Sequence, residues 1–229
     1  MIGYERFGDV AVVRMDDGKA NALSVGMLEG LGAALDRAAS EAKAVALFGR
    51  PGRFSAGFDL KVMMSSKEAA VALVGQGGEL FLRLFTHPQP VVIGVTGHAL
   101  AGGVLLAACG DVRFGVRGDF KLGLNEIAIG MPVPILAHEL ARARVDPRRL
   151  TEATLLAGVY DPEEAVKVGW LDRTSAPESL EADVLQEATR LAAFAGSHFA
   201  LTKRTLRAET IGYVRRTMEE NLRDFGVKG

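Results

Sequence analysis

The run VVIGVTGHALAGGVLLAAC, residues 91–109, contains no Asp, Glu, Lys or Arg and is about as long as a membrane-spanning helix. Glycines interrupt this run at four positions, namely Gly94, Gly97, Gly102 and Gly103. Two prolines, Pro88 and Pro90, stand just before it. These glycines and prolines predict a buried strand, a glycine turn and a buried helix rather than a membrane span.

The segments on either side also have apolar patterns that predict strands and helices. Short apolar runs predict further strands at residues 10–15, 44–48 and 112–114, and apolar residues three and four apart predict helices after Ser24 and at 67–85. Beyond residue 134 the patterns are helical, at 135–144, 147–157, 162–168, 181–194 and 200–222. Strands that alternate with helices early, followed by helices alone, indicate an α/β core with a C-terminal helical appendage.

The composition of the 229 residues is typical of a soluble globular protein, since 48% are hydrophobic and 27 Lys and Arg balance 28 Asp and Glu. Such a balance argues against disorder, and against a nucleic-acid binder, which needs a basic surplus. Cys109 is the only cysteine, so no intrachain disulfide forms, and residues 1–6 show no secretory signal. We expect a cytoplasmic protein with no nucleic-acid or membrane partner.

Common ligand motifs are missing from the sequence. It has no Gly-x-Gly-x-x-Gly fingerprint, no P-loop and no Gly-x-Ser-x-Gly elbow. The four histidines, His87, His98, His138 and His198, do not fall at metal-ligand spacing. The sequence therefore predicts no metal site and no bound cofactor.

Three stretches pair glycine with small residues: FSAGFDLK at 54–61, GHALAGGV at 97–104 and GLNEIAIG at 123–130. Glycine turns between a strand and a helix let the backbone approach a ligand and leave N–H groups free at the helix start. Two such turns side by side can aim two N–H donors at one oxygen, which makes an oxyanion hole. Spacing alone does not distinguish this from tight turns without a ligand.

The chain resembles the crotonase, or enoyl-CoA hydratase/isomerase, superfamily over about residues 4–205. The resemblance lies in four segments in the family's order, KANALS at 19–24, FSAGFDL at 54–60, GHALAGG at 97–103 and AVKVGWLD at 165–172. It implies the crotonase ββα spiral, an α/β fold, with a core over residues 1–195 and a C-terminal helical module over 196–229 for trimerisation and pocket covering. It also implies an acyl-CoA thioester substrate, coenzyme A being part of that substrate, and a homotrimer or dimer of trimers.

The resemblance also implies a role for each of several residues of the site. The backbone N–H groups of Phe58 and Gly102 are the two oxyanion donors that hold the thioester carbonyl, and Glu126 is a catalytic acid–base group. The implied substrate-binding residues, along the coenzyme A path and the thioester, are Lys19, Ala20, Ala22, Ala56, Gly57, Asp59, Leu60 and Leu105.

Leu105 departs from the hydratase pattern, in which this position and that of Glu126 are both glutamates. Adding water is best served by two carboxylates, whereas moving a double bond needs one base that takes a proton from C2 and returns one at C4. Leu105 together with the run 123–126 resembles mitochondrial-type Δ3-Δ2-enoyl-CoA isomerases. The sequence therefore predicts an enoyl-CoA isomerase whose base, Glu126, has a raised pKa in an apolar pocket.

Alternatives stay open at this point. The chain could be a weak hydratase, a non-catalytic acyl-CoA-binding protein or a structural partner that binds no coenzyme A, and Glu126 could be a solvated loop carboxylate. Asp59 is predicted to order its own turn and His98 to be a packed imidazole. Met63 and Val74 are predicted to belong to helix core rather than to an acyl-tail site.

Overall fold

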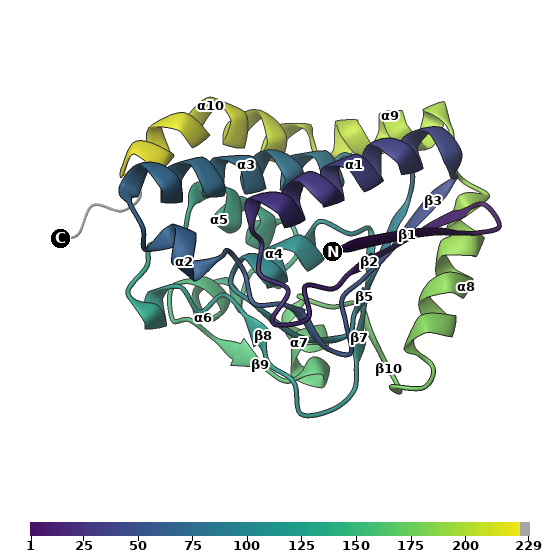
Figure 1. Cartoon of the computed structure of the whole chain (residues 1–229), viewed down its shortest axis with the longest axis horizontal. Helices are drawn as coiled ribbons and strands as arrows, with labels where there is room; N and C mark the ends of the chain where they lie inside the picture. Colours follow the sequence, from purple (N-terminus) through teal and green to yellow (C-terminus); the bar gives the residue numbers. More distant parts are fainter. Residues whose placement is uncertain (225–229) are drawn as a thin grey trace.

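Two β-sheets form the centre of the molecule, whose described residues in this computed structural model are 1–224 (Figure 1). The larger sheet has six strands in the order β1 (Ile2–Phe7), β2 (Val10–Met15), β3 (Ala44–Phe48), β5 (Val91–Val95), β7 (Val112–Val116) and β10 (Arg173–Ser175). The smaller has four in the order β4 (Gly52–Ser55), β6 (Gly97–Leu100), β8 (Leu122–Gly123) and β9 (Val159–Tyr160). The pairs β1–β2 and β8–β9 are antiparallel, and the other neighbouring strands run parallel.

The central strands of the larger sheet are buried on both faces, which explains their continuous apolar sequences. Along β3, Val45 and Leu47 point into the main core, while Ala46 and Phe48 point into a second core. Helices α1 (Val25–Glu41), α3 (Lys67–Phe85) and α4 (Gly102–Ala108) bury their apolar faces in the main core. Helix α8 (Leu180–Ala192) covers the second core on the other face of the sheet.

The remaining helices complete the layers around the two sheets. They are α2 (Leu60–Met63), the 3₁₀ turn η1 (Ile127–Ile129), α5 (Ile135–Arg142), α6 (Leu150–Thr154), α7 (Pro162–Val168), α9 (Ser197–Leu206) and α10 (Ala208–Asp224). Helix α10 lies along α3 in Figure 1 and also packs against α5. The α/β architecture predicted from the sequence is confirmed.

Most of the strongly patterned elements lie where the sequence predicts them. Strands β2, β3 and β5 and helices α3 and α7 have the predicted bounds, and the Ser24 Oγ caps α1 by accepting from the N–H of Met27 at 3.3 Å. Residues 91–109 form β5, then the unpredicted short strand β6, then α4. Within the described residues, no helix combines the length and apolar character needed to cross a membrane.

Two predicted helices differ clearly from the structure. The helix predicted at 147–157 is the shorter α6, Leu150–Thr154. The pattern at 200–222 predicts a single helix, but α9 ends and α10 begins on either side of Arg207. The Arg207 side chain at this break turns into the core and donates to Asp111. The predicted boundary between residues 195 and 196 falls in the loop before α9, and the end of the predicted C-terminal module, residues 225–229, lies outside the described residues.

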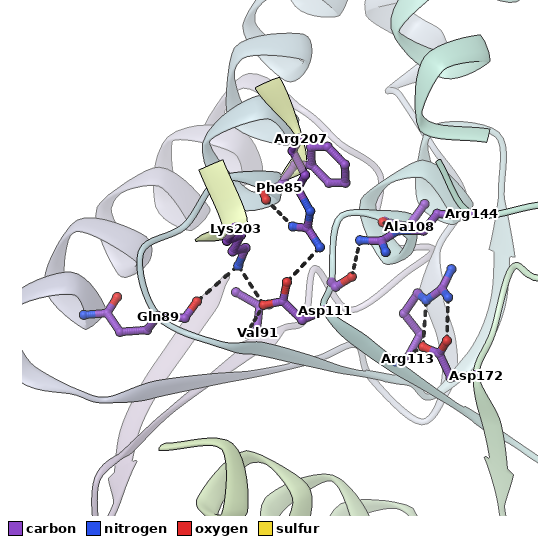
Figure 2. A network of polar contacts seen from close by, with 11 residues as sticks. Phe85, Gln89, Val91, Ala108, Asp111, Arg113, Arg144, Asp172, Lys203 and Arg207 are labelled. Carbon is purple, nitrogen blue, oxygen red and sulfur yellow. Dashed lines mark hydrogen bonds and ion pairs between the residues drawn. The ribbon is translucent and has the colours of Figure 1, made fainter. Parts of the chain in front are cut away.

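A buried ion cluster attaches α9 to the core (Figure 2). One carboxylate oxygen of Asp111 accepts from Lys203 Nζ at 2.6 Å and from the Val91 N–H at 2.7 Å. The other accepts from Arg207 Nη2 at 2.8 Å, and Arg207 also donates to the Phe85 carbonyl. We call Asp111, Lys203 and Arg207 the Asp111 cluster.

Positive charge exceeds negative charge in this part of the core, because the Asp111 cluster has two cations and one carboxylate and Arg144 adds a further cation nearby. Its Nε donates to the Ala108 carbonyl at 2.8 Å and its Nη2 to the Gly110 carbonyl at 2.7 Å, both at the C-terminal end of α4. Helix C-termini carry partial negative charge and stabilise such cations. Burial nevertheless lowers the pKa of Lys203 to about 8, so desolvation outweighs the attraction of Asp111.

Candidate active site

A cavity of about 180 Å³ opens where β4 and β6 end. Its lining residues are Ala56, Phe58, Leu60, Met63, Val74, Leu100, Ala101, Leu105, Asn125, Glu126, Ile129, Met131 and Pro134. Among them, Asn125 and Glu126 carry the polar side chains, and the rest of the wall is apolar. A larger groove of about 680 Å³ lies between β1 and α1, but it is open and its lining includes no buried ionisable side chain. The smaller cavity is therefore the better candidate for chemistry.

Two glycine turns meet at the wall of this cavity. Gly57 has a φ of +88°, and a Cβ added to it would lie 3.0 Å from the Gly102 nitrogen. A Cβ on Gly103 would lie 2.2 Å from the Ser55 carbonyl oxygen. Only glycine allows this approach, so the turn after β4 and the turn before α4 touch through their backbones.

Each turn leaves N–H groups without an acceptor among the described residues, including those of Phe58 and Gly102. Next to them in the chain, the Asp59 N–H donates to the Leu23 carbonyl at 3.3 Å and the Ala101 N–H to the Gly123 carbonyl at 2.9 Å. The N–H groups of Phe58 and Gly102 donate to no acceptor among the described residues. Gly102 is the first residue of α4, where the helix leaves its N–H groups unpaired. The structure thus brings two unpaired donors onto adjoining turns.

Substituting Gly103 by alanine is expected to destabilise the fold by about 1–3 kcal/mol, because the new methyl group overlaps the Ser55 carbonyl and forces the backbone apart. Gly26 is the matched control, since it lies exposed in α1 with nothing within 4 Å of an added Cβ. Gly26→Ala is expected to be neutral or stabilising by up to about 1 kcal/mol. Urea denaturation measures both, and equal effects would contradict the packing argument.

Glu126 follows β8 and is only 7% exposed, so it is not a solvated loop carboxylate. Burial raises its pKa from 4.5 to about 7. Its Oε2 has no hydrogen-bond partner among the described residues. Leu105, 2% exposed, lines the same cavity, so Glu126 is the acidic side chain there. A buried carboxyl of this kind is suited to take up and release a proton near neutral pH.

The predicted site residues divide into two groups. Those that line the cavity are Ala56, Phe58, Leu60, Leu105 and Glu126. Those that do not are Lys19, Ala20, Ala22, Gly57, Asp59 and Gly102. Gly57 and Gly102 form the turns behind the wall, and the Ala20 carbonyl accepts from the N–H of the cavity residue Ala56 at 3.0 Å. Lys19 is exposed.

Asp59 and His98 have the structural roles predicted for them. Asp59 caps α2, its carboxylate accepting from the Lys61 N–H at 2.9 Å. The His98 Nδ1 accepts from the Lys121 N–H at 3.0 Å, and its ring packs edge-on against Phe120. Within residues 1–224, no group of three or more His, Cys, Asp or Glu side chains is placed to hold a metal ion.

Sequence reasoning missed part of the cavity wall. Asn125, Met131 and Pro134 line it although they were not singled out. Met63 and Val74, predicted as helix core, pack in an apolar cluster but also line the cavity. The one signal available in the sequence was that Asn125 directly precedes Glu126, within residues 118–134, for which the sequence predicts neither a helix nor a strand.

The chain is similar in sequence and in structure to known proteins of one family. Residues 5–225 match the family model described as enoyl-CoA hydratase/isomerase. The chain is 29% identical to the mitochondrial enoyl-CoA delta isomerase 1 of Mus musculus, over 94% of this chain and 76% of that protein. It is 31% identical to a probable enoyl-CoA hydratase of Bacillus subtilis, over 80% of this chain and 71% of that one. The structure of an enoyl-CoA hydratase/isomerase family protein from Pseudomonas syringae superposes with a TM-score of 0.95 at 35% identity, covering 98% and 97% of the two chains.

Proposed function

The chain belongs to the enoyl-CoA hydratase/isomerase family, and from this premise we propose that it is a Δ3-Δ2-enoyl-CoA isomerase acting on acyl-CoA thioesters. One observation carries the choice of isomerase: a single buried carboxylate, Glu126, shares the cavity with Leu105 instead of with a second acid. The sequence similarity to the mouse isomerase supports the same choice.

The proposed mechanism uses the two unpaired N–H groups and Glu126. The Phe58 and Gly102 N–H groups donate to the thioester oxygen, which gains negative charge as an enolate forms. Glu126 takes a proton from C2, and the electrons of that C–H bond enter the enolate system. The protonated Glu126 then delivers the proton to C4, so the double bond moves from C3–C4 to C2–C3. The apolar wall keeps water away from the enolate.

The direct test is conversion of a 3-enoyl-CoA to the 2-enoyl-CoA by the purified chain, followed by the absorbance of the conjugated product. We expect turnover well above the uncatalysed rate. If the chain binds the thioester but neither isomerises it nor exchanges its C2 protons in deuterated water, it is a non-catalytic acyl-CoA-binding protein instead.

The activity is expected to depend on pH because only the carboxylate form of Glu126 accepts a proton. Burial raises the pKa of Glu126 to about 7, so the base form is lost as pH falls below that value. We expect kcat/KM to fall about tenfold per pH unit below pH 7 and to level off above it. Measurement from pH 5 to 9 checks this, and a flat profile down to pH 5 would contradict it.

A hydratase is the second candidate, supported by the 31% identity to the probable hydratase of Bacillus subtilis. With Leu105 in place of an acid, we expect hydration of crotonyl-CoA to be much slower than isomerisation of 3-enoyl-CoA. Comparable rates for the two reactions would favour the hydratase.

A further inference from the structure

The Phe58 ring packs against a position of α3 that has room only for glycine. Gly77 is buried in the interior of this helix, and a Cβ added to it would lie 2.5 Å from Cζ of Phe58 and still closer to Cε1. Glycine is a poor helix former, so a larger residue at this position would favour the helix by itself. The missing side chain makes room for the Phe58 ring.

The ring extends from α3 to the start of α4. On α3, Phe81 lies one helical turn after Gly77 on the same face, and its ring centroid is 6.0 Å from that of Phe58. The opposite edge of the Phe58 ring, at Cδ2 and Cε2, would lie 3.3 Å from a Cβ added to Gly102. The Phe58 side chain therefore fills the space between Gly77 and Gly102, and Gly102 carries the second of the two N–H groups.

Hydrogen bonds hold the backbone around Phe58 from one side. The Leu23 N–H donates to the Gly57 carbonyl at 2.8 Å, and the Asp59 N–H donates to the Leu23 carbonyl at 3.3 Å, which is long for such a bond. Leu23 and Phe58 form a parallel β-bridge, in which the Phe58 N–H points away from Leu23. On the side away from Leu23, the packing of the ring is what restrains this peptide.

We propose that Gly77 is a positioning residue for the two N–H groups that the proposed mechanism uses. Because Gly77 has no side chain, the Phe58 ring packs between α3 and Gly102. The packed ring then holds the N–H groups of Phe58 and Gly102 at the separation that one carbonyl oxygen requires. The proposal rests on the proposed function, which assigns both N–H groups to the thioester oxygen. Gly77 acts through Phe58, since it is not among the residues that line the cavity.

Steady-state kinetics of Gly77→Ala provide the first test. The added methyl group overlaps one edge of the Phe58 ring while Gly102 is close to the other edge, so we expect the turn that carries Phe58 to shift. We expect kcat for 3-enoyl-CoA isomerisation to fall about tenfold with KM nearly unchanged. Gly75→Ala is the matched control in the same helix, because a Cβ there would make an ordinary contact of 3.5 Å with Cδ1 of Leu222. It is expected to keep both constants.

Infrared spectroscopy of bound butyryl-CoA, labelled with carbon-13 at its carbonyl, follows the two donors directly. Hydrogen bonds to the carbonyl oxygen lower its stretching frequency, so we expect a lower frequency in the wild-type chain than for the free thioester in water. Gly77→Ala is expected to reverse most of this shift, and Gly75→Ala to keep it. Phe58→Leu removes the ring atoms that overlap the methyl group, so Gly77→Ala is expected to cause no further loss in that background.

The outcomes separate this proposal from the proposed function. If Gly77→Ala keeps the wild-type frequency, or changes it no more than Gly75→Ala does, the proposal is wrong while the isomerase assignment stands. A rise in KM at constant kcat also contradicts it, since the displaced ring would then block the cavity. If Gly77→Ala does not fold, Phe58→Leu alone decides: loss of the shift supports the proposal and its retention contradicts it. If the wild-type chain does not bind butyryl-CoA, or binds it without a shift, the proposed function fails together with the proposal.

Discussion

Replacing Glu126 by glutamine is expected to lower the rate of 3-enoyl-CoA isomerisation by a factor of about 10²–10⁴. Glutamine has nearly the same shape as glutamate but cannot accept a proton, so C2 loses its base while the cavity stays filled. Steady-state assays at pH 8, where the wild-type carboxylate is ionised, measure the effect on kcat. Wild-type turnover in this variant would show that Glu126 is not the base.

Stability provides the control for this substitution. Because the pKa of Glu126 is raised in the folded chain, the ionised group destabilises the fold as pH rises from 4.5 through about 7, and the full penalty is present above that range. The difference between the two pKa values corresponds to about 3 kcal/mol. We therefore expect Glu126→Gln to raise the free energy of unfolding at pH 8 by up to that amount. An inactive variant that is also less stable would point to misfolding instead.

Replacing Asp111 by alanine is expected to lower the free energy of unfolding by about 3–5 kcal/mol. The substitution leaves the buried Lys203 and Arg207 without their shared carboxylate and the Val91 N–H without its acceptor. Lys203 and Arg207 are 5% and 9% exposed, so both side chains are largely shielded from bulk solvent. Chemical denaturation followed by circular dichroism measures the loss.

The matched control is the exposed ion pair between Arg83 and Asp36, whose side chains are 46% and 74% exposed. Asp36→Ala is expected to change the free energy of unfolding by no more than about 1 kcal/mol, because solvent screens such pairs. If Asp111→Ala costs no more than Asp36→Ala, the Asp111 cluster does not hold α9 to the core.

The loss of stability caused by Asp111→Ala is also expected to affect the wall of the cavity. Helix α10 follows directly after Arg207, and its Met218 and Leu222 join Val74 in an apolar cluster beside the cavity. The Asn221 Oδ1 accepts from the Ile135 N–H at 2.8 Å, next to the cavity residue Pro134. We therefore expect the loss of the Asp111 cluster to loosen this part of the wall through α9 and α10.

Elements with strong local patterns could be predicted from the sequence. The apolar runs of β3 and β5 and the Ser24 cap of α1 depend on neighbouring residues alone. The two-residue strands β8 and β9 could not be found in this way, because so short a strand has no periodicity and exists only through its partner. The break at Arg207 was missed because α9 and α10 share one helical pattern.

The same division holds for the candidate site. The residues that meet at the cavity include Phe58, Leu105 and Glu126, which family motifs identified. Their catalytic and binding roles, the trimeric assembly, the C-terminal module, the cytoplasmic location and the lack of a separate cofactor stay predictions. The fold of residues 118–134, which have no periodic pattern, places three further residues in the wall, namely Asn125, Met131 and Pro134.

By itself, the sequence determined which backbone positions can approach one another, since Gly57, Gly102 and Gly103 lack the Cβ that would keep two turns apart. Through the family resemblance it also predicted that Glu126 would be the acid of the site, since Leu105 stands where a second glutamate is found in hydratases. The tertiary structure decided that Glu126 is buried and that its pKa rises to about 7. The physical reason is that desolvation depends on what surrounds a carboxylate, and those surroundings come from segments far apart in the chain.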